Sequence, residues 1–327
     1  MIYRTIIWAL FLMNSMAPAQ TTLSGGRGML RVFSAETVQA GSVFLNSFYL
    51  AFFRSAGNDL TFNMGVTYGI SNSVELTAQA VPYQDDQMHK WGPPGDTQLG
   101  MKWRSPLASS RISSGLRAFV ILPTALQHNA RFEPYSSNQV AWGIMGLLTF
   151  DFTNSSGSFP LKVHTNFGYL DHNIETLSFK DDTDQVLFGL GIKFSAHPFI
   201  LYTEYTGEFF VNNALVRFGD NSMRLTQGFK FLAPLNLIVD FGLDIGLSRS
   251  LDAYQPPLHQ YADWKIFTGM TVHFKTRKVS GLAARETKID RKQHSRALEM
   301  LRDRRKSVGQ DLEKMRKKLK KTKQKNL

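Results

Sequence analysis

Strict alternation of apolar and polar residues, repeated along most of the chain, is the feature that most restricts its fold. The clearest case is the stretch LIVDFGLDIGL, in which every second residue from Leu237 to Leu247 is a large apolar side chain. Side chains of a β-strand point alternately to the two sides of a sheet. The pattern therefore predicts a strand with one apolar face and one polar face.

Twelve segments of roughly ten residues show this alternation in a clear or weaker form. They are Val43–Phe53, Leu60–Tyr68, Val74–Val81, Thr97–Arg104, Ser114–Leu122, Gln139–Phe152, Leu161–Leu170, Val186–Phe194, Phe199–Phe209, Met223–Phe231, Leu237–Leu247 and Trp264–Phe274. Short turns such as 69–73, 195–198 and 233–236 alternate with long polar connections such as 84–96, 123–138, 171–184, 211–221 and 248–263. Three connections fit this rule less well, at 54–59, 105–113 and 153–160. An even strand count with short turns at one end and long loops at the other is typical of bacterial transmembrane barrels.

The predicted fold class is therefore all-β: a transmembrane, antiparallel, up-and-down β-barrel of about twelve strands. A soluble barrel or sandwich is the alternative, because alternation alone does not say which face points inward. Aromatic positions favour the membrane, since lipid-facing rings gather at the two interfaces. One predicted belt, at the short-turn end, comprises Tyr68, Trp103, Phe152, Phe194, Phe199, Phe231 and Phe274, and the other comprises Phe53, Trp142, Tyr169, Phe209 and Trp264.

Both ends of the chain differ from this strand pattern. Residues 1–19 have a basic residue, a short apolar run and an A-x-A exit at Ala17–Ala19, which predicts a secretory signal peptide. A buried N-terminal strand or helix is the alternative for this stretch. We expect residues 20–42 to form a short periplasmic segment and residues 43–274 to form the barrel. An even number of strands places both termini in the periplasm of an outer-membrane protein.

Residues 275–327 account for the positive charge of the chain: with 20 of the 38 Lys and Arg but only 6 of the 26 Asp and Glu, they carry a net +14, and the rest of the chain carries −2. Apolar residues from Leu298 to Leu319 follow a broken heptad spacing, which predicts a basic helix over about 287–321 with a frayed end. Such an arm would attract anionic partners, such as peptidoglycan, lipid phosphates or an acidic periplasmic protein. It equally fits a solvated tail that binds nothing. Export argues against nucleic acid as the partner.

Gly269, Val272 and Phe274 close the last predicted strand in a way that resembles the C-terminal signal read by the barrel-assembly machinery. Two further segments, LRVFSAETVQAGSV (Leu30–Val43) and GDTQLGMKWR (Gly95–Arg104), resemble outer-membrane barrels of the phenol-degradation (MetA-pathway) transporter family. This resemblance implies a barrel in outer-membrane lipid that passes small, and in this family hydrophobic, molecules. It supplies no site residues that can be carried over.

Charged residues of both signs fall on the polar faces of the predicted strands and form the candidate lumen site. They are Glu75, Lys102, Arg117, Lys162, His164, Lys193, Glu204, Glu208, Arg224, Lys230, Asp240, Asp244 and Lys265. We expect cross-strand pairs between Lys230 and Asp240 and between Glu208 and Arg224. One interpretation is a lattice of ion pairs that fills a narrow barrel. The other is a charged constriction that selects solutes.

Catalytic and metal-binding patterns are absent from the sequence. None of the eight histidines stands two residues before a serine, the spacing used by twelve-stranded outer-membrane phospholipases, and no HExxH motif occurs. We expect no enzyme activity, cofactor or metal. The first functional hypothesis is a passive channel or facilitator for small solutes. The second is a docking protein, in which the barrel anchors a basic arm that binds cell wall or a partner.

Overall fold

The computed structural model describes residues 20–54, 57–84, 93–107, 111–126, 136, 138–153, 160–172, 184–211, 213, 216–248 and 263–275. The predicted signal peptide and almost all of the predicted basic tail lie outside these residues. Among the described residues, the only helical element is a short 3-10 turn, η1, at Phe218–Asp220, and no helix is long and apolar enough to cross a membrane.

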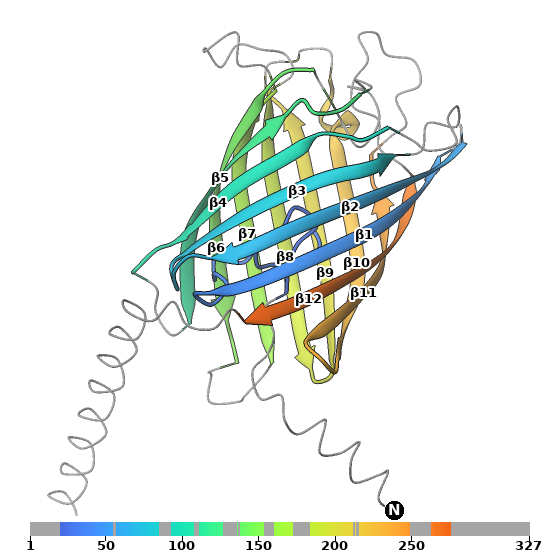
Figure 1. The fold of residues 1–327 in the computed structure, drawn as a ribbon. Coiled ribbons are helices and arrows are strands. Elements are labelled where there is room, and N and C mark those ends of the chain that lie inside the picture. The colour runs from blue at the N-terminus through green and yellow to red at the C-terminus, as the bar shows by residue number, and fades with distance from the viewer. Residues whose placement is uncertain are drawn as a thin grey trace, which may run out of the picture. The chain divides into compact units, whose positions relative to one another are not determined.

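Twelve antiparallel strands close into one ring, as Figure 1 shows. Their bounds are β1 Ser42–Arg54, β2 Gly57–Gly69, β3 Val74–Gln84, β4 Thr97–Arg104, β5 Ile112–Leu122, β6 Ala141–Asp151, β7 Leu161–Asp171, β8 Gln185–Ala196, β9 Phe199–Phe210, β10 Ser222–Ala233, β11 Leu237–Gly246 and β12 Trp264–Lys275. Each strand pairs with its neighbours in the chain, and β1 pairs with β12, so no edge strand is left. The prediction of a closed twelve-stranded barrel is confirmed.

The alternating pattern divides each strand between the two sides of the barrel wall. Apolar side chains such as Leu190, Phe241 and Ile245 face outward and are 38–41 % exposed, whereas the residues between them are largely buried. In a soluble barrel the apolar face would instead be buried at the centre. An exposed apolar band on a ring with every strand paired is the arrangement that a hydrocarbon environment requires.

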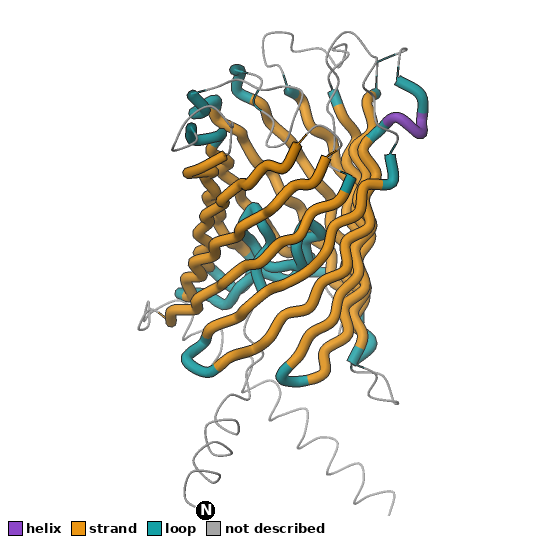
Figure 2. The backbone as a smooth tube through the Cα atoms, turned by 90° about the vertical axis from the view of Figure 1, so that its right-hand side faces the viewer, coloured by secondary structure: helices purple, strands orange, loops and turns teal. Residues whose placement is uncertain are grey.

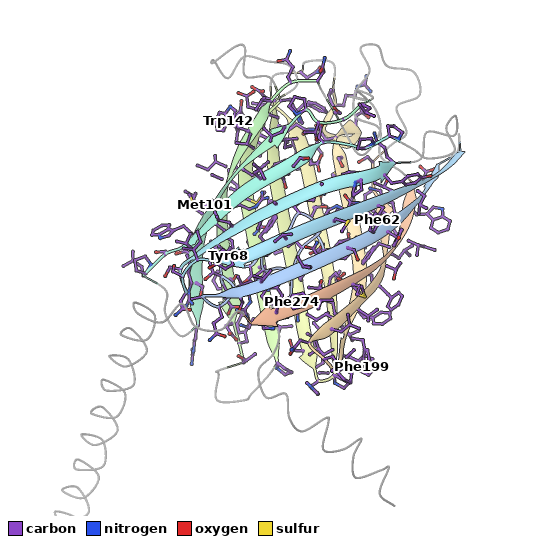
Figure 3. All side chains as sticks on the ribbon, viewed as in Figure 1. Phe62, Tyr68, Met101, Trp142, Phe199 and Phe274 are labelled. Atoms are coloured by element: carbon purple, nitrogen blue, oxygen red, sulfur yellow. The ribbon has the colours of Figure 1, made fainter. Side chains whose placement is uncertain are left out.

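Aromatic side chains gather at the two ends of the strands, as predicted. Figure 3 shows Trp142 near the end with the long loops and Tyr68, Phe199 and Phe274 near the end with the short turns. Neighbouring rings contact each other within these belts: Phe199 lies 5.3 Å from Phe231 and Trp142 lies 6.0 Å from Tyr169, measured between ring centroids. Such belts are expected where a barrel wall passes through the two interfaces of a bilayer.

Glycines on the inner face allow large rings to lie flat across neighbouring strands. A side chain at Gly269 would approach the Phe48 ring to 2.3 Å, and one at Gly228 would approach the Tyr202 ring to 2.3 Å. Both rings are almost completely buried. Gly269, which the sequence predicts to be part of an assembly signal, has a packing role in the structure.

Residues 20–41 lie inside the barrel, which corrects the expectation of a separate periplasmic segment. Figure 2 shows this part of the chain as a loop enclosed by the strands. Its residues Met29, Leu30 and Val32 are at most 1 % exposed and pack against Phe48 and Tyr202 of the barrel wall. The polar inner faces of the strands supply hydrogen-bond partners to the backbone of this segment. We call residues 20–41 the interior segment.

Candidate functional site: the barrel interior

The interior segment is a compact series of bends rather than a strand or helix. Two isolated bridges, Thr21 with Arg27 and Gly28 with Phe33, fold it back on itself. Gly25 and Gly26 have φ values of 75° and 81°, a left-handed conformation that glycine adopts without strain. Backbone groups that the bends leave unpaired are available to side chains of the wall.

Glu75 of β3 and Lys102 of β4 hold one side of the segment. The Glu75 carboxylate accepts hydrogen bonds from the backbone N–H of Arg27 at 3.0 Å and of Val38 at 2.7 Å. The Lys102 ammonium donates to the carbonyls of Arg27 and Ser34 and forms an ion pair with Glu75 at 2.7 Å. Both charges are buried, and their hydrogen bonds offset the cost of removing them from water.

Glu204 of β9 holds the tip of the segment. Its carboxylate accepts hydrogen bonds from three successive backbone N–H groups, those of Leu30, Arg31 and Val32, at 2.9 to 3.2 Å. Hydrogen bonds to a carboxylate are stronger than those to a neutral acceptor. This single side chain therefore fixes the conformation of the tip.

Lys230 of β10 and Asp240 of β11 form the cross-strand pair expected from the sequence. They are directly opposite in the register, and the Lys230 ammonium lies 2.5 Å from the Asp240 carboxylate. Lys230 also donates to the carbonyls of Thr21 and Met29, and the Tyr202 hydroxyl donates to Asp240 at 2.8 Å. The pair thus joins the wall to the interior segment.

Asp244 of β11 lies among cations near the end of the barrel with the long loops. Arg31 of the interior segment forms an ion pair with it at 2.9 Å, while Arg224 and Lys265 of the wall lie at 3.6 and 3.7 Å. The Thr226 hydroxyl also donates to this carboxylate. We call Arg31, Arg224, Lys265, Asp244 and the nearby Glu208 the outer cluster.

Glu36 of the interior segment forms ion pairs near the end with the short turns. It lies 2.6 Å from Lys162 of β7 and 2.8 Å from Arg27, and Lys162 also contacts Asp151 at 2.7 Å. Burial alone would raise the pKa of Glu36, but Arg27 and Lys162 outweigh that effect and hold the pKa well below its ordinary value. Glu36 is therefore an anion at any physiological pH.

Neutral polar side chains complete the contacts and were missed by the sequence analysis, which considered only charged residues. Asn166 of β7 accepts from the Phe33 N–H at 2.7 Å and donates to the Phe33 carbonyl at 2.8 Å. The Thr149 hydroxyl of β6 accepts from the Ala35 N–H at 2.9 Å. The alternation of the strands predicts that these side chains point inward. Their hydrogen bonds could not be predicted, because they depend on the backbone segment that occupies the lumen.

The structure puts all thirteen candidate residues on the inward-facing side of the wall. Eleven are buried, and Lys162 and Glu208 are partly exposed. Arg117 lies over the rings of Phe33 and Phe119 at 4.3 and 4.4 Å. Glu208 is opposite Ser222 in the register and Arg224 is opposite Thr206, so the expected Glu208–Arg224 pair is at most a diagonal one.

A closed antiparallel ring with an apolar exterior and a charged, hydrogen-bonded interior defines a β-barrel of the membrane-spanning class. Among the described residues no group of His, Cys, Asp and Glu is arranged to bind a metal ion. Most ionic groups of the interior instead bind one another and the backbone of residues 20–41.

No protein-family model and no curated protein matches the sequence. Solved structures with a similar arrangement are the NanC porin (TM-score 0.49, 10 % identity, 70 % of this chain and 98 % of that one), an outer-membrane channel from Pseudomonas putida F1 (0.47, 10 %, 73 % and 98 %) and the KdgM porin (0.46, 7 %, 70 % and 99 %). Likenesses this distant carry no argument about what this chain binds. The relation to phenol-degradation transporters stays a prediction.

Proposed function

We propose that this protein is an outer-membrane channel through which small solutes pass passively, and that residues 20–41 narrow its lumen. The observation that carries the proposal is the difference between the two faces of the barrel wall. Its outer face is apolar, while its inner face presents charged and hydrogen-bonding groups from all around the ring. A closed barrel used only as an anchor would not need a polar interior of this extent.

The outer membrane is the compartment that fits best. The signal-peptide pattern of residues 1–19 indicates export, and closed β-barrels span the outer membrane of bacteria. Assembly there would involve the barrel-assembly machinery, for which Gly269, Val272 and Phe274 are the proposed signal. An even strand count would leave both termini in the periplasm.

The interior segment limits what can pass. Because its backbone and buried side chains lie within the ring of strands, we expect a low conductance that favours small solutes over large ones. The alternative function, docking through the basic tail, depends on residues outside the described part of the chain, and no observation in the barrel favours it.

Single-channel recording in planar lipid bilayers tests this proposal. The purified full-length protein should give discrete, small conductance steps that persist at moderate voltage. A silent protein, both intact and after deletion of residues 20–41, would mean that the barrel is sealed and would overturn the proposal.

A further inference from the structure

Cations outnumber carboxylates around Glu36, at the end of the lumen with the short turns. Arg27, Lys162 and Lys193 face this region, and the described carboxylates near them are Glu36 and Asp151. We call these five residues and His164 the inner cluster. One positive charge remains without an equivalent carboxylate, and a buried surplus charge is costly unless a counter-ion binds or the group loses its proton.

Lys193 is the cation of this region that forms no ion pair with a described carboxylate. The register places it directly opposite Lys162, a like-charge pairing that destabilises a sheet unless it is compensated. Lys162 has both Glu36 and Asp151 within 2.7 Å. Within the described part of the chain, by contrast, the Lys193 ammonium has neither a hydrogen bond nor an ion pair, although the residue is only 8 % exposed.

His164 provides a second unpartnered nitrogen near Lys193. His164 lies opposite Gly191 in the register, and Gly191 is two residues before Lys193 in β8. His164 and Lys193 therefore share the inner face of the wall, and His164 is completely buried. Its Nδ1 is 2.9 Å from the Thr149 hydroxyl, and its Nε2 has no partner among the described residues.

The hydrogen-bond chain through Thr149 is compatible with a proton on Nε2 of His164. The Ser34 hydroxyl accepts from the Glu36 N–H, so its own proton is free for the Thr149 oxygen at 3.4 Å. Thr149 also accepts from the Ala35 N–H, and when Ser34 donates to it as well, the Thr149 proton goes to Nδ1 of His164. In that arrangement the imidazole proton is on Nε2, which has no hydrogen-bond partner among the described residues.

We propose that Lys193 and His164 form a binding site for a small monovalent anion, with a carboxylate as the preferred chemical class. With the imidazole proton on Nε2, His164 adds an N–H donor to the Lys193 ammonium on the same inner face, and the two donors are suited to the two oxygens of a carboxylate. Glu36 and Asp151 stand close by and would repel a multiply charged ligand, because one surplus cation balances only one negative charge. The inference builds on the proposed channel function, since it names small organic anions as solutes that the lumen accepts.

Titration of the full-length protein in detergent micelles with acetate tests the site directly. The protein is labelled with ¹⁵N-histidine, and the His164 signal is assigned as the one lost in His164→Gln. Acetate should shift this signal in a saturable way, whereas acetamide, its neutral counterpart, should not. Lys193→Gln should weaken the response about tenfold, and Lys193→Arg should retain most of it.

The exposed Arg217, outside the barrel strands, supplies the matched control, because Arg217→Gln removes the same charge and should leave the titration unchanged. No saturable shift with acetate, an equal shift with acetamide, or an unchanged response in Lys193→Gln would overturn the site. This readout needs no conductance. A silent barrel that binds acetate would therefore refute the channel alone, and a conducting barrel that ignores acetate would refute the site alone.

Discussion

Glu204 shows how one residue of the wall can hold the interior segment in the lumen. Its carboxylate accepts from three consecutive amides at the tip of the interior segment, and no other described acceptor contacts those three N–H groups. A buried N–H that loses its acceptor costs about 1–3 kcal/mol. The tip should therefore be the part of the segment most sensitive to a single substitution.

Replacement of Glu204 by alanine is expected to loosen the tip without unfolding the barrel. A local loss of about 2 kcal/mol corresponds to roughly 30-fold faster amide exchange. Hydrogen exchange read by mass spectrometry should show this at residues 30–32, with a smaller effect for Glu204→Gln, which keeps an acceptor. Thr203→Ala, on the outward side of the same strand, is the control. Unchanged protection in Glu204→Ala would contradict the assignment.

Lys230 and Asp240 carry a different prediction, because each is the buried counter-charge of the other. Lys230→Met should destabilise the barrel by about 3–5 kcal/mol, since it leaves the Asp240 carboxylate uncompensated. Adding Asp240→Asn removes the uncompensated charge and should recover most of the lost stability. Urea unfolding in lipid vesicles measures both, and a double variant as unstable as the single one would show that the pair is not the cause.

At the scale of elements, the interior segment is the part that distinguishes this barrel from an open one. It is held by contacts from β3, β4, β6, β7, β9 and β10, so it is attached around much of the ring rather than at one edge. Many of these contacts are ionic or hydrogen-bonded, and two apolar clusters add to them, one at the tip and one that joins Phe33 and Ala35 to the wall.

Deletion of residues 20–41 should therefore raise the single-channel conductance severalfold, because the charged wall that remains would be hydrated. Planar-bilayer recordings of the deleted and intact proteins give the comparison. Deletion of residues 281–327, which also removes no residue of β1–β12, should leave the conductance unchanged. Equal conductance with and without residues 20–41 would mean that the segment does not lie in the solute path.

The strands were largely predictable from the sequence and the interior segment was not, for a physical reason. In each strand, outward residues such as Leu190 meet lipid and are apolar, whereas inward residues such as Lys193 meet the lumen and are polar. The alternation is therefore visible in the sequence of a single strand. Residues 20–41 carry no such period, and their partners, such as Glu204, lie more than 170 positions away in the chain. The same limit applies to His164 and Lys193, whose shared inner face follows from the register between β7 and β8.

At the scale of the whole molecule, stability depends on an apolar outer surface that meets lipid. An arginine on this surface costs about 2–4 kcal/mol at the middle of the bilayer and about 0–1 kcal/mol near its edges. Leu190→Arg, near the middle of β8, should therefore destabilise the protein in lipid vesicles much more than Ile245→Arg, near the end of β11. Equal effects in urea titrations would argue against a transmembrane orientation.

A cross-link formed in native membranes tests the central claim most directly, which is that a closed barrel holds its own N-terminal segment inside. The chain has no cysteine, and the hydroxyl oxygens of Ser34 and Thr149 lie 3.4 Å apart. With both residues replaced by cysteine, mild oxidation of outer membranes should produce a disulfide that peptide mapping identifies. The pair Ser34→Cys and Ser114→Cys, whose second member lies on the outward side of β5, should stay reduced. If the first pair failed to link, or both linked equally, residues 20–41 would not lie where the account places them.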